Sequence, residues 1–259
     1  MISPQLTYYN MGTGVTAFST TRQGGCSTGN YAAFNINGYC GDDEVHIAAN
    51  KVALCGLLGI DSNRLVMPHQ VHDCVVRRID GPQQGVIEGV DAVMTDVPQP
   101  CIGVSTADCI PVLLYDSTHR AVSAVHAGWR GTVLRIVQKA VETMRDTYGT
   151  APADLQAVIG PGISLDSFEV GDEVYETFAK EGFAMETISQ RFPAADGSSI
   201  EKWHIDLPMC NRQQLLSKGI PQSQISVSEV CTFQQFETYF SARRLGINSG
   251  RIFTGILML

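Results

Sequence analysis

The chain has 259 residues, of which 44% are hydrophobic and 17% charged, and its formal net charge is −8. This composition is typical of a folded, soluble protein with a sizeable core, and it excludes a disordered chain. The acidic balance argues against nucleic-acid and anionic-membrane partners, because both require a basic face on the protein.

The N-terminal residues and the cysteines indicate the compartment. The first residues contain neither the basic nor the apolar segment of a secretory signal, so we expect a cytoplasmic protein. No apolar run reaches the ~20 residues that span a bilayer. The eight cysteines form no Cys-X-X-Cys pair, which favours free thiols over a disulfide framework.

The first predicted strand, residues 17–21, leads into a glycine-rich turn that contains Arg22, Gly24 and Gly25. This turn is either a plain surface loop or a ligand loop. In a ligand loop the two glycines would let the backbone approach a ligand closely while Arg22 meets an anion. The turn is not a phosphate-binding P-loop, because no Gly-Lys-Ser/Thr follows it.

A helix is predicted next, with Asp42 or Asp43 as its N-cap and an end near Gly59. Helical spacing assigns its buried face to five positions, Val45, Ala48, Ala49, Val52 and Cys55.

A dense series of apolar runs then predicts a sizeable sheet, with some strands buried on both faces. The runs are residues 65–67, 75–79, 90–95, 101–105, 110–116 and 121–125. A helix follows, with Thr132 as a possible N-cap and Gly149 at its end. Its apolar stripe consists of Val133, Ile136, Val137, Ala140, Val141 and Met144.

The remaining chain predicts alternating elements around one loop. These are a strand at 155–159, a helix at 172–181, a loop at 191–202, a helix from Asp206 to Gly219, and strands at 225–230 and 251–259. Because no linker or internal repeat interrupts the chain, we expect a single domain over residues 1–259.

Three residues with metal-binding side chains, His72, Cys109 and His126, each lie where an apolar run ends. Two imidazoles and a thiolate suit Zn²⁺, and three protein ligands leave a fourth position open, as in catalytic zinc sites. A second hypothesis uses no metal. Cys109 is then a nucleophile, His126 or His72 is its base, and Asp108 or another carboxylate orients the base. The simplest alternative is that Cys109 is a buried thiol.

Arg130 follows His126 by four residues, and Gly128 and Gly131 permit a tight path between them. Arg130 is therefore either a ligand for a phosphate or carboxylate near the metal, or part of a surface salt bridge. Arg243 has a similar position near the C-terminus.

Motifs spread over nearly the whole chain resemble those of the YfiH family. This family has long been described as multicopper polyphenol oxidase or laccase, and it is better described as zinc-dependent purine nucleoside phosphorylases. The matching stretches are residues 18–20 with 22–25, 41–43, 69–72, 91–92, 107–109, 126–131, 159–161, 168–170, 206–207, 231–232 and 241–243.

The resemblance implies an α/β (α+β) fold of the CNF1/YfiH-like type, a single domain with a large mixed β-sheet or sandwich flanked by helices. It implies metal ligation and catalysis by His72, Cys109 and His126, with Zn²⁺ as the metal and Cu²⁺ as the alternative. Substrate-binding residues are then expected among Arg22, Gln70, Asp108, Arg130 and Arg243.

The implied activity is phosphorolysis of adenosine, inosine and methylthioadenosine, together with deamination of adenosine. The partners are then a nucleoside and phosphate, with no nucleic acid or membrane, and the protein is a monomer or a weak dimer. One alternative is an amidase or cysteine-type hydrolase that edits peptidoglycan precursors, a role linked to bacterial members of the family. The other is a copper-dependent polyphenol oxidase.

Two departures from the family pattern and one count qualify the resemblance. Thr21 stands as an additional residue before Arg22, and Lys51 replaces an arginine in the first helix. Lysine keeps the charge but loses the bidentate geometry. A multicopper oxidase needs on the order of ten histidines for its copper centres. This chain has six and no His-X-His pair, so it cannot build those centres.

Overall fold

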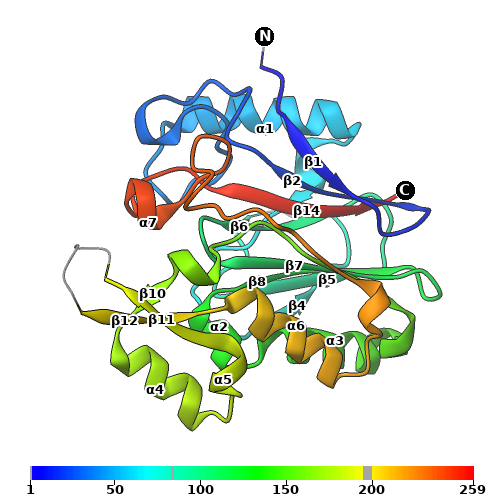
Figure 1. Ribbon diagram of the computed structural model, residues 1–259. Helices are drawn as coiled ribbons and strands as arrows, with labels where there is room; N and C mark the ends of the chain where they lie inside the picture. Colours follow the sequence, from blue (N-terminus) through cyan, green and yellow to red (C-terminus); the bar gives the residue numbers. More distant parts are fainter. Residues whose placement is uncertain (1, 83–84, 195–199) are drawn as a thin grey trace.

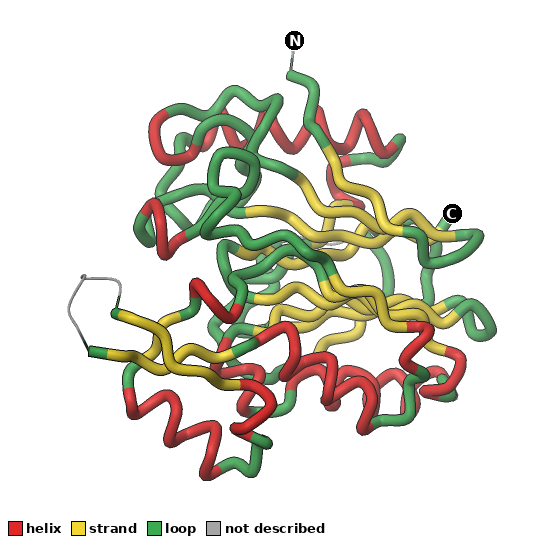
Figure 2. Tube along the Cα trace, viewed as in Figure 1, coloured by secondary structure: helices red, strands yellow, loops and turns green. Residues whose placement is uncertain are grey.

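Two β-sheets packed face to face form the middle of the molecule, and helices cover both outer faces (Figure 1, Figure 2). The computed structural model describes residues 2–82, 85–194 and 200–259. Helix α1 lies over one sheet, while α3 and α6 lie over the other, and this gives four layers. The predicted mixed α/β class is therefore confirmed, and its large sheet is divided into two sheets that pack together.

The first sheet has the order β1-β2-β14-β6-β3 and is antiparallel except where β3 joins β6. Its strands are β1 (Leu6–Tyr9), β2 (Val15–Thr20), β14 (Ile252–Met258), β6 (Cys101–Thr106) and β3 (Leu65–Val66).

The second sheet has the order β13-β9-β7-β8-β5-β4, with parallel pairs at its two edges. Its strands are β13 (Ile225–Val227), β9 (Leu155–Ile159), β7 (Ile110–Asp116), β8 (Ala121–Ala127), β5 (Ala92–Thr95) and β4 (Val76–Arg78). A small antiparallel sheet stands to one side, with β10 (Glu169–Val170), β12 (Glu201–Ile205) and β11 (Ser189–Pro193).

Short helices connect and cover these sheets. They are α1 (Glu44–Leu58), α2 (Trp129–Val133), α3 (Ile136–Tyr148), α4 (Asp172–Lys180), α5 (Met185–Ile188), α6 (Leu207–Ser217) and α7 (Ala242–Leu245). Five 3₁₀ turns complete the elements: Gly29–Tyr31, Ser62–Arg64, Pro152–Asp154, Leu165–Ser167 and Gln222–Gln224. Among the described residues no helix has the length and apolar character to cross a membrane.

The central strands are buried on both faces, which explains their continuous apolar sequences. In β7, Val112 and Leu114 pack toward α3, whereas Leu113 and Tyr115 pack toward the first sheet. The period-2 alternation of a strand thus serves two cores at once. A third core, which includes Phe18 and Phe253, lies between the first sheet and α1.

The predicted buried face of α1 is wrong, although its caps are confirmed. Asp43 caps the helix by accepting from the Val45 backbone N–H, and Gly59 ends it in the left-handed conformation. However, Val45 and Val52 are exposed, and the buried face consists of Ile47, Asn50, Leu54 and Cys55.

The helix predicted to begin at Thr132 is two helices in the structure. Arg135 adopts a left-handed conformation (φ 63°) between α2 and α3, which breaks the helical path. Thr132 lies within α2 and is buried against α6, where its hydroxyl accepts from the Asn211 side chain. The predicted end at Gly149 is confirmed.

Two loop predictions also need correction. Residues 191–193 belong to β11 and residues 201–202 to β12, whereas residues 195–199 lie outside the described residues. In the glycine-rich turn, Gly24 and Gly25 face the protein's own backbone. A Cβ on Gly24 would lie 1.9 Å from the Ser3 carbonyl oxygen, and one on Gly25 would lie 2.1 Å from the Ala33 carbonyl oxygen. The two glycines therefore allow the turn to pack closely against the protein's own backbone.

Candidate metal centre

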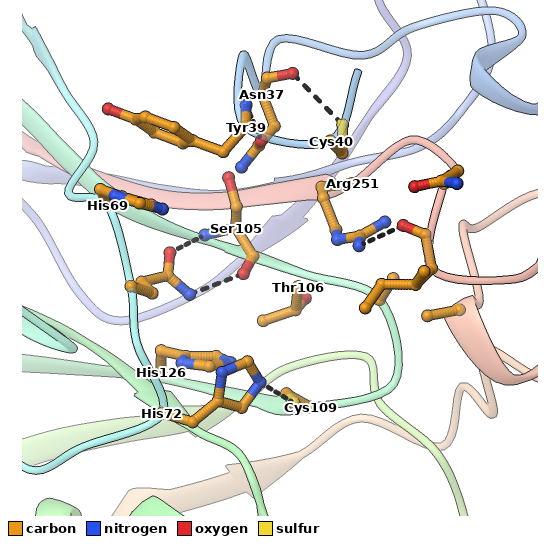
Figure 3. A pocket seen from close by; sticks show the side chains of 15 residues that line it. Asn37, Tyr39, Cys40, His69, His72, Ser105, Thr106, Cys109, His126 and Arg251 are labelled. Atoms are coloured by element: carbon orange, nitrogen blue, oxygen red, sulfur yellow. Dashed lines mark hydrogen bonds between the residues drawn. The ribbon is translucent and has the colours of Figure 1, made fainter. Parts of the chain in front are cut away.

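The structure brings the side chains of His72, Cys109 and His126 together at one end of the two-sheet core (Figure 3). His72 lies in the loop between β3 and β4, and Cys109 lies in the short connection between β6 and β7. Both segments cross from the first sheet to the second. His126 projects from β8, which is central in the second sheet.

The donor atoms fit a zinc ion. All three candidate ligand atoms lie within 4.8 Å of one another, and His72 Nε2 is 3.7 Å from Cys109 Sγ. Zinc bonds of usual length at a tetrahedral angle would place a nitrogen and a sulfur about 3.6 Å apart. The imidazole rings of His72 and His126 meet edge to face, with centroids 4.7 Å apart. This donor set suits zinc, and three ligands leave one coordination position open.

Asp91 orients two of these three ligands. Its carboxylate is fully buried and accepts a hydrogen bond from His126 Nδ1 at 2.8 Å. The other ring nitrogen, Nε2, is then left to bind a metal. The same carboxylate accepts the backbone N–H groups of Val71, His72 and Asp73 at 2.9–3.2 Å. One side chain therefore fixes both the ring of His126 and the loop that carries His72.

The electrostatics of the site favour a thiolate at Cys109. Burial acts to raise the pKa of its thiol. The charge of His126 and hydrogen bonds from His126 and His72 outweigh this effect, so the net pKa is lowered. Burial likewise acts to lower the pKa of His126, and the Cys109 and Asp91 negative charges raise it overall. Each group thus favours the charged form of the other, and a thiolate is the form of cysteine that binds metal.

The backbone around the ligands is strained and tightly packed. His72 (φ 63°) and Asp108 (φ 89°) both have left-handed conformations, which are uncommon for residues other than glycine. Gly128 lies directly behind the ligands. A Cβ at this position would come within 2.9 Å of the His72 ring and 3.0 Å of Cys109 Sγ.

A cavity of about 540 Å³ opens above the three ligands. Its opposite side carries Asn37 and Tyr39, and the Tyr39 ring stacks on His69 with centroids 4.0 Å apart (Figure 3). Thr106 also lines the cavity, and its buried hydroxyl has no hydrogen-bond partner within the described ranges. Arg251 is the single lysine or arginine among the described lining residues, and none of those residues is an aspartate or glutamate.

The predicted substrate-binding residues Gln70 and Asp108 have structural hydrogen bonds. Gln70 lines the cavity, but its side-chain amide pairs with the Ser105 backbone N–H and C=O at 2.7 and 2.8 Å. Asp108 accepts from the Thr232 hydroxyl and the Arg243 backbone N–H. Asp108 therefore does not orient a histidine, and Asp91 occupies that role.

The three predicted phosphate-binding arginines lie outside the cavity lining. Arg22 donates to the carbonyls of Ala32 and Phe236, so its guanidinium holds two loops together. Arg130 lines a separate hollow and lies over the Trp129 ring. Arg243 lies over the Phe168 ring and donates to a backbone carbonyl.

Sequence reasoning missed Asp91 and Arg251 as site residues. The signal for Asp91 was an acidic residue in an otherwise apolar run, Val90-Asp91-Ala92-Val93, which is costly unless the charge is paired. Arg251 immediately precedes the last strand and offers no such signal. Its backbone N–H donates to Asn35, and its guanidinium donates to carbonyls in the preceding turn.

The family model described as "Multi-copper polyphenol oxidoreductase laccase" matches residues 16–259. The crystal structure of Bacillus licheniformis hypothetical protein YfiH superposes with a TM-score of 0.88 at 30% identity, covering 95% of this chain and 93% of that one. This chain belongs to the YfiH family.

Two curated relatives are more similar in sequence to this YfiH-family chain. A purine nucleoside phosphorylase of Bacteroides thetaiotaomicron is 45% identical over 252 residues, covering 94% of this chain and 92% of that protein. Adenosine deaminase RL5, from an unknown prokaryotic organism, is 44% identical over 251 residues, covering 94% of each.

The multicopper description of the family does not match the donor groups of this chain. Among the described residues, His72, Cys109 and His126 form the one cluster of histidine, cysteine and acidic side chains able to hold a metal ion. A blue-copper site with a separate three-copper cluster requires several such groups.

Proposed function

We propose that this chain is a zinc-dependent purine nucleoside phosphorylase that also deaminates adenosine. The observation that carries the proposal is the open His72/Cys109/His126 ligand set at the end of a substrate-sized cavity. Two relatives support the proposal. One is named purine nucleoside phosphorylase and the other adenosine deaminase, and both are similar to this chain over 94% of its length. Adenosine, inosine and methylthioadenosine are the proposed nucleosides.

The cavity volume of about 540 Å³ lies within the range typical of small-molecule sites. A zinc ion held by the three ligands would supply a Lewis acid at this end of the cavity. Across the cavity, the stacked pair of Tyr39 and His69 offers a flat aromatic surface for the purine. The unpaired hydroxyl of Thr106 offers a hydrogen bond to the sugar or the base.

We assign phosphate to the part of the cavity beside Arg251. Its charge is uncompensated by any acidic lining residue that the structure describes, so the cavity favours an anion. Hydrogen bonds to the carbonyls of Ile247, Ser249 and Gly250 hold the guanidinium in place. Such fixed positive charge can stabilise an anionic nucleophile without reorganising during the reaction.

The first experiment measures release of hypoxanthine from inosine with and without phosphate, using zinc-loaded protein. We expect turnover only with phosphate, and loss of turnover in the Cys109→Ser variant. Cys26→Ser is the matched control, since Cys26 is a half-buried thiol that contacts His46 and Asn50 far along the chain from the ligands. Equal turnover without phosphate would refute phosphorolysis.

The second experiment separates phosphate binding from nucleoside binding. Adenosine deamination consumes water and needs no phosphate, so it serves as an internal control. In Arg251→Gln we expect the KM for phosphate to rise at least about tenfold, as for loss of a charge-assisted contact, while deamination persists. Arg22→Gln, Arg130→Gln and Arg243→Gln are comparison variants. The assignment to Arg251 fails if one of these raises the KM instead.

A metal-free cysteine hydrolase is the second candidate, because Cys109, His126 and Asp91 form a nucleophile–base–carboxylate chain. The two candidates differ in their response to chelation. A chelated protein that retains full activity, and is covalently labelled at Cys109 by its substrate, would favour the hydrolase.

A further inference from the structure

A cysteine and a lysine meet outside the cavity, close to the loop that carries a metal ligand. Cys74 is half-buried and lies two residues after His72, just before β4. Lys139 is on the first turn of α3, the helix that covers the second sheet, and its side chain is exposed. The Lys139 Nζ atom lies 2.7 Å from Cys74 Sγ.

This nitrogen–sulfur distance is short for a hydrogen bond of a cysteine sulfur, although Ser105 Oγ lies at a similar 2.8 Å from the Met67 thioether sulfur. Over the described ranges, the other hydrogen bonds of cysteine sulfurs measure 3.4–3.7 Å. None of those seven involves an amine. The Lys139 amine and the Cys74 sulfur are therefore close enough for one atom to bridge them.

We propose that Cys74 and Lys139 form a covalent N–O–S crosslink when the protein is oxidised by dioxygen. The S–H bond of the cysteine and one N–H bond of the neutral lysine amine break, and one oxygen atom becomes bonded to both nitrogen and sulfur. The two hydrogens and the second oxygen atom leave as one water molecule. Dioxygen is reduced, sulfur and nitrogen are oxidised, and a thiol reductant reverses the step.

The crosslink would join the loop that carries His72 to α3 by a covalent bond. Cys74 continues directly from the loop that Asp91 holds through the Asp73 backbone N–H, and Cys74 also packs against the core beneath α3. A bond to Lys139 would fix the end of this loop to α3 and would remove the positive charge of the lysine. Cys74 is not part of the His72/Cys109/His126 cluster, so the crosslink leaves the metal ligands intact.

The test uses full-length, zinc-loaded protein that is kept either in air or anaerobically with a thiol reductant. Tryptic digestion and mass spectrometry should reveal, in the aerobic sample, one joined peptide that contains Cys74 and Lys139. Trypsin does not cleave after the modified Lys139, so the second peptide runs through that residue. We expect the joined mass to exceed the sum of the Cys74 peptide and this uncleaved Lys139 peptide by about 14 Da, for one oxygen gained and two hydrogens lost. Dithiothreitol should restore a free thiol at Cys74.

Lys139→Arg is the matched variant, because it keeps the positive charge but lacks the amine. We expect the Cys74 thiol of this variant to remain labelled by iodoacetamide in air, while the wild-type thiol is lost. Cys26, also half-buried, serves as the reference thiol in both proteins. Full labelling of wild-type Cys74 after aerobic incubation would overturn the proposal. Equal loss of the thiol in Lys139→Arg would also overturn it, since it would mean oxidation without the lysine.

Discussion

Asp91 controls the ligand geometry at the scale of a single residue, because its two oxygens serve four N–H donors. In Asp91→Asn one oxygen becomes an NH₂ group that faces those donors, and the negative charge is lost. We expect zinc affinity to fall by about 10–100-fold, as for other partners of metal-bound histidines. Competition with a chromophoric chelator measures this change.

Asp116→Asn is the control for this prediction. Asp116 is also fully buried and also accepts from a histidine ring, His119 Nδ1, at 2.8 Å, but it lies at the far end of β7. Zinc affinity should be unchanged in this variant, although the protein loses stability. If both variants bind zinc like the wild type, Asp91 does not position the ligands.

Gly128 gives a second prediction at this scale. The methyl group of Gly128→Ala would lie 2.9 Å from the His72 ring and 3.0 Å from Cys109 Sγ, both shorter than the ordinary contact distance of 3.4–4 Å, so the ligands would have to shift. We expect at least about a tenfold loss of zinc affinity, with far-UV circular dichroism unchanged. Gly56→Ala is the control: its Cβ would meet nothing within 4 Å, and alanine in the helix interior should stabilise the protein by about 0.5–1 kcal/mol. Wild-type zinc binding in Gly128→Ala would contradict this view of the packing.

The sequence was sufficient for residues whose chemistry is rare and insufficient for residues whose role depends on long-range contacts. The clustering of His72, Cys109 and His126 could be predicted because each residue belongs to a motif of the YfiH family, whereas their spacing alone left other roles open. The role of Arg251 could not be predicted, because arginines are common near strand ends. What distinguishes it from Arg22 is which carbonyls happen to surround each guanidinium.

At the scale of elements, α1 shows how a polar residue can determine which face of a helix is buried. Asn50 is fully buried and accepts from the Cys26 backbone N–H, while its amide donates to Ser27 Oγ and to the carbonyl of Asn35. Counting apolar side chains placed Val52 on the buried face, but these hydrogen bonds turn it to solvent. An apolar stripe predicts burial only where no polar network competes for the same face.

Asn50→Ala should therefore destabilise the protein by about 2–4 kcal/mol, since it leaves several buried backbone and side-chain groups unpaired. Urea unfolding measures the change. Val52→Ala, on the neighbouring exposed face, should shift the stability by less than about 0.5 kcal/mol. Similar effects of the two substitutions would indicate that the face carrying Val52 is buried, as the apolar pattern of the sequence predicted.

The break between α2 and α3 could not be seen in the sequence, because both helices belong to one apolar stripe. The left-handed turn at Arg135 is held by contacts distant in sequence. Its guanidinium lies 3.5 Å from the centroid of the Phe183 ring and donates to the Glu181 carbonyl. The break gives α2 its own direction, and α2 begins directly after Gly128, at the metal ligands.

At the scale of the whole molecule, the layered arrangement was largely predictable, because strands such as β7 and β8 have the continuous apolar sequence of strands buried on both faces. The division into two sheets was not, since pairing between distant strands such as β2 and β14 leaves no local pattern. His72 and Cys109 come from two of the segments that cross between these sheets, so zinc binding should stabilise the whole fold.

We expect the midpoint of thermal unfolding to rise with free zinc concentration, by the equivalent of about 2.7 kcal/mol at a hundredfold excess over the dissociation constant. Scans in chelator-buffered zinc measure this dependence. Cys109→Ser should weaken the dependence greatly, while Cys26→Ser should retain it. A midpoint independent of zinc in the wild-type protein would mean that these residues do not bind zinc in the folded state.

The crossing positions of His72 and Cys109 also bear on the order of events during folding. Cys109 directly precedes β7, and the β7–β8 hairpin brings it beside His126. His72 is 37 residues from Cys109 in sequence, and it joins them only after β4, β5 and β8 have paired. Contacts between residues so far apart in sequence form late. Coordination of zinc by all three ligands then waits for the loop that carries His72, and the newly made chain must pair these strands before it acquires its metal.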